Sequence, residues 1–380
     1  MKKILIIIPS IKYGGQEKVA VNTARMLAKE YDVTLFVFYR GEKEIDSSGL
    51  NVVSCEETTD TKIKIIYRLM KLYKLKKKYK FDVCLSFSPS ANLINILTKR
   101  HERTLTSIRG YKSIFAKSSR FRVIQRKADG IICVSKAIAD KVYSYYGIRR
   151  EKVFVLYNAY DFEEIERLSQ EIVDDYEFNK FTICNVSHMN EVKGIEHLLR
   201  AFSKVNKKDA DTQLLLIGDG NLRDKLEEYT KILGIQDSVT FMGYRENPYK
   251  YVKKSQLYVL TSENEGFPNS LVEAMIYIPA ISVDCETGPY EILTNGNSEH
   301  PKNRYSICPY GILTPNLAKS RDYATIQLEK EEIILADAIL ELKNDNSLYE
   351  HLKKAGRKRS LEYSIVSYYR KLIEIIENNN

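Results

Sequence analysis

Long apolar runs are missing from this chain of 380 residues. No stretch approaches the roughly 18 uncharged apolar residues that a membrane-spanning helix requires. The N-terminus reads Met1-Lys-Lys and then Ile4 to Ile8, but Pro9 ends the run and no small-residue cleavage site follows. We therefore interpret it as a buried first strand rather than a signal peptide, and we expect a soluble protein or one peripheral to a membrane.

Closely spaced cysteines are also missing. The six cysteines are scattered singly, without a C-x-x-C pair or a histidine at metal-ligand spacing. This pattern favours a reduced, cytoplasmic setting. An acidic triplet, Asp209-Ala-Asp211, lies ahead of an expected strand rather than after one. We interpret it as a solvated turn, and we expect no metal.

Acidic residues are scarce in one part of the chain. Residues 1–160 hold 32 Lys and Arg against 14 Asp and Glu, a net +18, whereas residues 161–380 hold 27 against 36, a net −9. The densest basic stretch, residues 62–80, has nine Lys or Arg and no acid, with apolar residues interleaved. A basic amphipathic helix is typical of binding to an anionic membrane surface, and an ordinary surface helix is the alternative.

Charge alone would also suit a nucleic-acid-binding protein, whose binding would depend strongly on salt. The chain contains no recognised nucleic-acid-binding module. We therefore expect no nucleic-acid partner.

Short apolar runs alternate with helix-period segments along the chain. We expect strands at 4–8, 33–38, 83–87, 104–108, 130–134 and 153–156, and then at 181–186, 213–217, 239–242, 257–261, 280–283 and 310–313. Strands that alternate with helices predict parallel α/β sheets. We expect two Rossmann-like, doubly wound domains at 1–165 and 178–363, joined by a polar connection at 165–181. A terminal amphipathic helix at 364–380 is expected to pack back on the first domain, and ligands are expected in a cleft between the domains.

Two glycines follow the first strand, in Tyr13-Gly-Gly-Gln-Glu17. Paired glycines at a helix entrance expose backbone N–H groups to an anion, although a simple strand-to-helix turn explains them equally well. No third glycine completes a dinucleotide-binding fingerprint, which disfavours a dehydrogenase.

A second loop follows the strand at 257–261. It reads Glu265-Gly-Phe-Pro-Asn-Ser-Leu-Val-Glu273-Ala-Met. Gly266 and Pro268 predict a tight loop, and a helix is expected to begin near Asn269 or Ser270. Free N–H groups and a positive helix end predict an anion site, and two carboxylates can accept hydrogen bonds from vicinal hydroxyls. On spacing alone, an N-terminal acid that stabilises the helix dipole and an exposed helical glutamate are an equal alternative.

This loop resembles the signature of the family 4 glycosyltransferases. Further segments match that family in order: Tyr13 to Val19, Asn158-Ala-Tyr-Asp161, Lys193-Gly194, Ile217-Gly-Asp-Gly220 and Asp284 to Leu293. The resemblance spans nearly the whole chain and implies the GT-B fold. It implies that the second domain binds a nucleotide sugar and the first an acceptor, and that a hexose is transferred with retention and without cofactor or metal. We expect the donor to be a UDP-sugar. As the acceptor, a lipid-phosphate-linked glycan at the inner membrane face would suit the basic first domain.

The same resemblance assigns roles to single residues. Glu273 would hold the ribose hydroxyls of the donor, Glu265 the hydroxyls of the transferred sugar, and Lys193 would neutralise the departing diphosphate. The expected catalytic residues are Glu265, Lys193 and His188. The expected donor-binding residues are Gly15, Gly243, Gly266, Phe267, Pro268, Asn269, Ser270, Leu271 and Glu273.

Two positions depart from the family pattern. His188 stands where the family has arginine; if it must be protonated to bind the diphosphate, binding should weaken as pH rises. Arg109 lies where many members have a histidine, and we expect Arg109 and Asn158 to contact the acceptor or the donor. A nucleotide-sugar epimerase or a phosphorylase on a similar fold is the alternative function.

Overall fold

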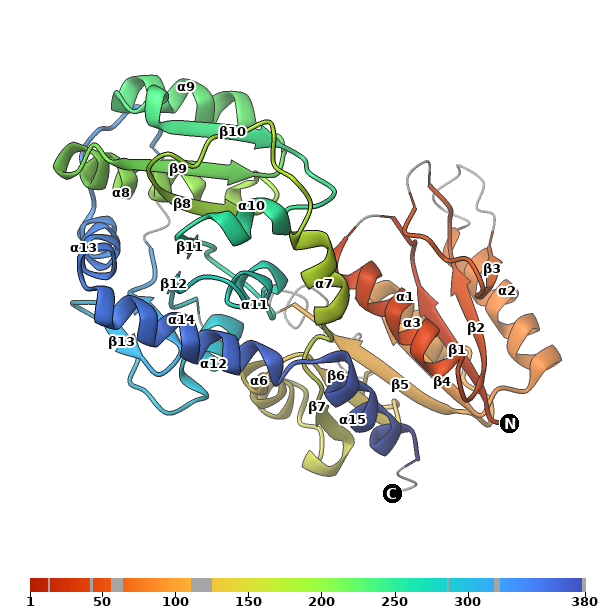
Figure 1. Ribbon diagram of the computed structural model, residues 1–380. Helices are drawn as coiled ribbons and strands as arrows, with labels where there is room; N and C mark the ends of the chain where they lie inside the picture. The colour runs from red at the N-terminus through yellow and green to blue at the C-terminus, as the bar shows by residue number, and fades with distance from the viewer. Residues whose placement is uncertain are drawn as a thin grey trace. The chain divides into compact units, whose positions relative to one another are not determined.

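The computed structural model describes residues 1–12, 14–41, 44–55, 64–110, 125–285, 287–317 and 322–377. The chain forms two compact units, one of Met1–Ala159 with Val366–Asn380 and the other of Tyr160–Ile365 (Figure 1). The boundary between the two units lies between Ala159 and Tyr160, a few residues before residue 165, where the first domain was expected to end. The reason is that Tyr160 already belongs to the second unit, where its N–H donates to the Tyr363 carbonyl at 3.1 Å and its carbonyl accepts from Ile365 N–H at 3.0 Å.

The first unit is built on a parallel sheet of seven strands in the order β3-β2-β1-β4-β5-β6-β7. The strands are β1 Lys3–Ile8, β2 Asp32–Val37, β3 Asn51–Ser54, β4 Val83–Phe87, β5 Arg103–Ile108, β6 Gly130–Cys133 and β7 Val153–Val155. The central strands are buried along nearly their whole length. This is why β1 and β4 read as nearly continuous apolar runs. β5 is as deeply buried but reads RTLTSI, with Thr and Ser between its apolar residues. The edge strand β3 was not predicted, because it has only four residues and is half exposed.

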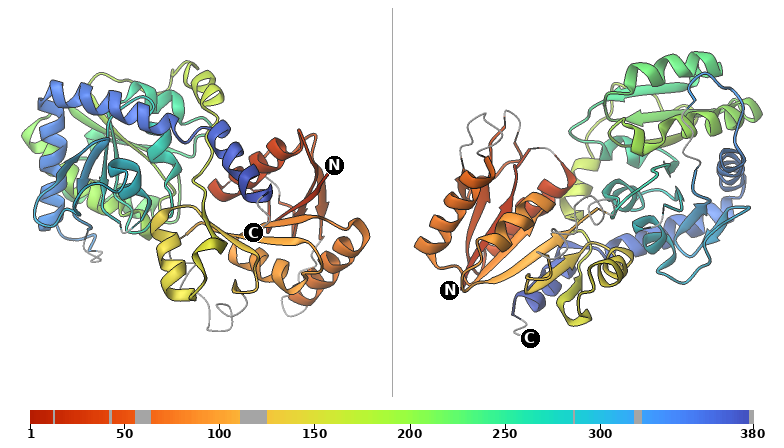
Figure 2. Two further views of the ribbon diagram at one scale, coloured as in Figure 1. Left: turned by 90° about the horizontal axis from the view of Figure 1, so that it is seen from below. Right: turned by 180° about the vertical axis from the view of Figure 1, so that it is seen from behind.

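Helices cover this sheet on both faces. They are α1 Gly15–Leu27, α2 Lys64–Tyr79, α3 Pro89–Leu97, α6 Lys136–Tyr146 and α15 Ile365–Glu377, with a 3-10 turn η1 at Arg150–Lys152. α2 packs against α3. α15 lies beside α1, where the Tyr368 hydroxyl and Thr23 Oγ1 share a hydrogen bond of 2.8 Å (Figure 2). Positions 378–380 of the expected terminal helix and 62–63 of the basic stretch lie outside the described residues.

The second unit has its own seven-stranded sheet, in the order β10-β9-β8-β11-β12-β14-β13. The strands are β8 Phe181–Val186, β9 Thr212–Ile217, β10 Val239–Gly243, β11 Leu257–Leu260, β12 Ala280–Val283, β13 Ser306–Cys308 and β14 Gly311–Thr314. All neighbouring pairs are parallel except β13 with β14. The two doubly wound α/β units are the expected GT-B architecture.

The helices of this unit pack on the sheet through apolar faces. They are α7 Phe162–Ser169, α8 Ile195–Lys208, α9 Arg223–Leu233, α10 Tyr249–Lys254, α11 Asn269–Ala274, α12 Gly288–Thr294, α13 Lys330–Asn344 and α14 Asn346–Leu361, with 3-10 turns η2 Glu191–Lys193 and η3 Gln236–Ser238. Leu198 and Phe202 of α8 and Leu335 and Ile339 of α13 belong to one buried core. Among the described residues, no helix is both long enough and apolar enough to cross a membrane.

Candidate functional site

Loops that follow two neighbouring strands, β8 and β11, are tied together at the carboxyl edge of the second sheet. Thr261 Oγ1 donates to the Lys193 carbonyl at 3.0 Å, and Glu263 N–H donates to the Val192 carbonyl at 2.8 Å. Gly194 has a φ of 58°, and a Cβ at this position would lie 2.5 Å from the Thr261 carbonyl oxygen. Only glycine allows this approach, which places Lys193 beside the loop that carries Glu265.

Lys193 and Glu265 form an ion pair at this edge. Lys193 Nζ lies 2.7 Å from Glu265 Oε1, with the two side chains 24% and 12% exposed. The structure thus brings together two residues that lie 72 positions apart in the sequence. Both keep access to solvent, so a ligand that carries an anionic group and hydroxyls could exchange with either partner. Their roles toward a ligand stay predictions.

The loop that follows β12 packs on the chain between Glu265 and α11. Thr287 Oγ1 donates to the Glu265 carbonyl, and a Cβ at Gly288 would lie 2.7 Å from the Gly266 carbonyl oxygen and 2.8 Å from Phe267 Cα. Pro268 precedes α11, which has only six residues. Because so short a helix has a small dipole, the expected preference for an anion would come mainly from loop N–H groups and Lys193.

Buried tyrosines hold the side chains of this segment from behind. The hydroxyl of Tyr160 donates to Asn269, that of Tyr258 to Ser270 and that of Tyr249 to Glu273. The Phe267 ring meets the Tyr363 ring edge-on, with the two centroids 5.1 Å apart. Leu271 is fully buried, so only its backbone can face a ligand. These tyrosines could not be predicted from the sequence, because 27 tyrosines are spread through the chain and no spacing distinguishes these four.

Other predicted residues lie on neighbouring loops of the same sheet. His188 is exposed just after β8, five positions before Lys193. Gly243 ends β10 with a φ of 69°, and its carbonyl accepts from Gly218 N–H at 2.9 Å. A Cβ at Gly218 would lie 1.9 Å from the Ser187 carbonyl oxygen, so glycine is required there. The contacts of His188 and Gly243 with a ligand stay predictions.

The remaining predicted residues belong to the first unit. Arg109 follows β5 and its guanidinium donates to Asn158 Oδ1, while lying 5.6 Å from the centroid of the Phe87 ring. Asn158 is buried, and Arg109 is half-buried. Gly15 is the first residue of α1, after Gly14 at the N-cap, and both glycines are exposed.

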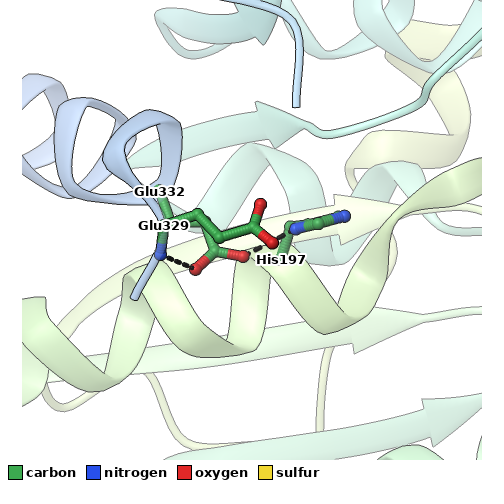
Figure 3. Close-up of side chains that lie close together, drawn as sticks. All are labelled: His197, Glu329 and Glu332. Carbon is green, nitrogen blue, oxygen red and sulfur yellow. Dashed lines mark hydrogen bonds and ion pairs between the residues drawn. The ribbon is translucent and has the colours of Figure 1, made fainter. Parts of the chain in front are cut away.

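A buried cluster in the second unit has side chains close enough to ligate a metal ion: His197, Glu329 and Glu332 (Figure 3). Glu332 Oε1 lies 2.6 Å from His197 Nδ1 and accepts from Arg200 Nε at 2.6 Å, and its Oε2 accepts from Glu329 N–H at 2.9 Å. Burial would raise the pKa of Glu332, but the hydrogen bonds from His197 and Arg200 outweigh burial and lower it. Both carboxylate oxygens of Glu332 already take part in hydrogen bonds. We therefore interpret this cluster as a salt-bridge network that ties α8 to α13.

The acidic triplet at 209–211 lies immediately before β9, at the amino edge of the sheet, as expected. Asp209 Oδ1 accepts from Asp211 N–H at 3.0 Å, which is the geometry of an Asx turn. Its other oxygen accepts from Lys343 of α13, and this bond lowers the pKa of Asp209. Asp209 therefore pins α13 to the turn rather than only facing solvent.

Comparisons with known proteins agree over both units. The family model described as Glycosyltransferase Family 4 matches residues 13–164, and the model described as Glycosyl transferases group 1 matches residues 169–310. An uncharacterized glycosyltransferase of Methanocaldococcus jannaschii is 28% identical, with 90% of this chain and 91% of that protein covered.

Two further proteins extend this similarity. A Campylobacter jejuni 4-alpha-N-acetylgalactosaminyltransferase, which acts on an N-acetylgalactosamine-N,N'-diacetylbacillosaminyl-diphospho-undecaprenol, is 26% identical over 77% of this chain and 83% of its own. The crystal structure of Anabaena HepE in complex with UDP and glucose superposes with a TM-score of 0.76 at 18% identity and covers 99% of both chains. This last likeness is one of fold.

Proposed function

Because this chain belongs to the family 4, group 1 glycosyltransferases, we propose that it transfers a hexose, with retention, from a nucleotide-diphosphate sugar to a lipid-linked glycan. The donor is proposed to be a UDP-sugar, in line with the UDP bound by a protein of the same fold. The acceptor is proposed to carry a polyprenyl diphosphate, as the substrate of the Campylobacter relative does.

The observation that carries this proposal is the Lys193–Glu265 pair, with Glu265 on the loop that leads into α11, the helix that carries Glu273. A cation and two carboxylates at the carboxyl edge of a parallel sheet match the parts of a nucleotide sugar. In the proposed complex Glu265 accepts from sugar hydroxyls and Glu273 from ribose hydroxyls. Lys193 exchanges its contact with Glu265 for the diphosphate.

Charge develops on the diphosphate as the bond from the anomeric carbon to the phosphate oxygen breaks. Lys193 and the backbone N–H groups from Gly266 to Leu271 would stabilise that charge, and a fixed cation in such a place supplies several kcal/mol. Retention is proposed to follow from attack by an acceptor hydroxyl on the face that the diphosphate leaves. The acceptor oxygen forms the new bond to the anomeric carbon, and the departing phosphate oxygen takes the hydroxyl proton. The proposed step uses no protein nucleophile, and Glu265 acts in it only by accepting hydrogen bonds from the sugar.

The test begins with ligand binding to the wild-type protein. Thermal melts with UDP-glucose, UDP-galactose, UDP-N-acetylglucosamine, UDP-N-acetylgalactosamine and GDP-mannose should identify one stabilising donor, because a ligand at about 100 times its Kd adds roughly 2.7 kcal/mol. That donor is then incubated with an undecaprenyl-diphosphate-linked glycan, and the product anomer is assigned by NMR. If none of these nucleotide sugars stabilises the protein or donates its sugar, the proposal fails. GDP-mannose as the donor would overturn the proposed UDP-sugar, and an N-acetylhexosamine donor would overturn the proposed hexose. Epimerised donor or phosphate-dependent cleavage would point to the alternative enzymes.

We further propose that α2 rests on an anionic membrane surface. Ile66, Met70 and Tyr73 are 58%, 50% and 46% exposed, and their spacing places them on one face of the helix. The exposed Lys74 and Lys77 lie on or beside this face. An apolar stripe among cations, without an acid on the helix, is the pattern of an interfacial helix rather than of an ordinary surface helix.

The opposite face of α2 is firmly anchored. Leu72 is fully buried, and Lys76 is 1% exposed. Lys76 Nζ lies 2.7 Å from Glu102 Oε1 and donates to Asn95 Oδ1 at 2.8 Å and to the Asn95 carbonyl at 3.0 Å. The helix can therefore press its outer face on a membrane without leaving the unit.

Vesicle sedimentation tests this surface. Replacing Ile66, Met70 and Tyr73 together by Ser should weaken binding to vesicles of phosphatidylglycerol and phosphatidylcholine by about tenfold or more, because apolar area no longer enters the interface. The matched control is Ile172→Ser with Ile232→Ser, two exposed apolar residues of the second unit. Equal binding by the wild type and the triple variant, or an equal loss in the control, would reject this surface.

A further inference from the structure

Three buried tyrosines from separate elements direct their hydroxyls at residues 269–273. Tyr249, the first residue of α10, donates to Glu273 Oε1 at 3.1 Å. Tyr258 of β11 donates to Ser270 Oγ at 2.7 Å. Tyr160, which precedes α7, donates to Asn269 Oδ1 at 2.8 Å. The rings are 5%, 0% and 3% exposed, so the hydroxyls meet these side chains away from bulk solvent.

In two of these bonds the tyrosine hydroxyl is the donor, of Tyr249 toward Glu273 Oε1 and of Tyr258 toward Ser270 Oγ. Burial raises the pKa of Tyr258. Burial, followed by the charge of Glu273, raises the pKa of Tyr249. Both hydroxyls therefore stay protonated at physiological pH, as donation to Glu273 and Ser270 requires.

This direction fixes what the two partners can offer a ligand. Glu273 is half-buried and receives a proton donor on Oε1, so its carboxylate is held in one orientation with Oε2 as a further acceptor. Ser270 accepts through Oγ, so its own hydroxyl hydrogen must point away from Tyr258. The segment thus presents an acceptor at 273 and a donor at 270.

We propose that Tyr249 and Tyr258 are positioning residues that set this donor and acceptor pattern for a nucleoside diphosphate. Ser270 donates to a phosphate oxygen, which is an acceptor, and Glu273 Oε2 accepts from a ribose hydroxyl, which is a donor. The inference rests on the proposed donor site and adds to it the residues that orient it.

Buried tyrosine hydroxyls need a partner in any case, so the test must separate orientation of a ligand site from ordinary stability. Tyr349, which is half-buried, provides the control. Its hydroxyl donates to the Gln256 carbonyl at 2.9 Å, just before β11 begins and thus at the opposite end of that strand from the loop. Tyr349→Phe should lower Tm, by no more than Tyr258→Phe does, and leave nucleotide affinity unchanged.

The experiment is a pair of double-mutant cycles read by calorimetric binding of UDP, with GDP as the second probe. Tyr249→Phe and Tyr258→Phe should each raise Kd about three- to tenfold, as expected for one hydrogen bond. Tyr249→Phe should have no further effect in a Glu273→Ala background, and Tyr258→Phe should have none in a Ser270→Ala background. Purely additive effects, or an equal loss of affinity in Tyr349→Phe, would overturn the proposal.

A modified ligand separates the two tyrosines from one another. With 2′,3′-dideoxyuridine diphosphate, which lacks the ribose hydroxyls, the effect of Tyr249→Phe should disappear and that of Tyr258→Phe should persist. If Tyr249→Phe still raised the Kd for this ligand, the assigned contact between Glu273 and the ribose would be wrong. Binding of neither UDP nor GDP to the wild-type protein would instead count against the proposed function itself, which distinguishes the two failures.

Discussion

Three lysine–glutamate pairs in this protein have the same Nζ to Oε distance, 2.7 Å, in very different surroundings. The side chains of Lys76 and Glu102 are 1% exposed, those of Lys193 and Glu265 are 24% and 12% exposed, and those of Lys231 and Glu228 are 65% exposed. The distance alone therefore says little about what a pair does. Burial and the other bonds of each lysine decide whether the pair stabilises the fold, can exchange with a ligand, or contributes almost nothing to stability.

The largest effect on stability is expected at the buried pair. Lys76→Ala leaves the Glu102 carboxylate buried without its cation, which costs about 3–5 kcal/mol. Urea unfolding followed by circular dichroism measures this loss. The double variant Lys76→Met with Glu102→Leu removes both charges and should recover most of the stability; a loss below about 1 kcal/mol in the single variant would contradict the assignment.

Next in size is an effect on activity at the site pair. Lys193→Ala should lower the transfer rate about 10²- to 10³-fold, the range for one electrostatic contact to a developing negative charge, and leave Tm little changed. Lys253→Ala is the control, because Lys253 pairs with Glu166 at 2.9 Å outside the 265–273 loop and is about as exposed as Lys193. Full activity in the folded Lys193→Ala variant would remove Lys193 from the proposed mechanism.

The fold was predictable from sequence because both sheets consist mostly of strands buried on two faces. The two strands that were not predicted, β3 and β13, are short edge strands of four and three residues with partly exposed side chains. Their patterns lack the apolar run that identified the central strands. Edge strands are positioned by their neighbours, and that information lies far away in the sequence.

The candidate site was predictable only in part. Lys193, Glu265 and Glu273 follow strands in recognisable motifs, whereas Tyr249 and Tyr258 act through the tertiary structure and carry no local signal. The same holds for Lys76, which looked like one more cation of the basic stretch but is buried. A sequence shows which side chains are charged, and the fold decides which of them meet water.

Titration of the buried Glu332 offers a smaller and pH-dependent test of whether burial and hydrogen bonds decide what a charged group contributes to stability. Its pKa is lowered from an ordinary 4.5 because the hydrogen bonds from His197 and Arg200 outweigh burial. The stability that it contributes is therefore complete above pH 4.5 and is lost as the pH falls through the lowered value. Glu332→Gln should lower Tm at pH 7, and its difference from the wild type should shrink below pH 4.5. A difference independent of pH between 3 and 7 would contradict this.

The smallest effect is expected at the exposed pair. Glu228 and Lys231 lie three residues apart on α9, and the Glu228 carboxylate raises the pKa of Lys231. Water screens both charges and the two long side chains lose rotamer entropy when they pair, so Lys231→Ala should shift Tm by less than about 1 °C. Melts at low and high salt measure this, since any effect should fade as salt is added. A shift comparable to that of Lys76→Ala would mean that distance, and not burial, governs these pairs.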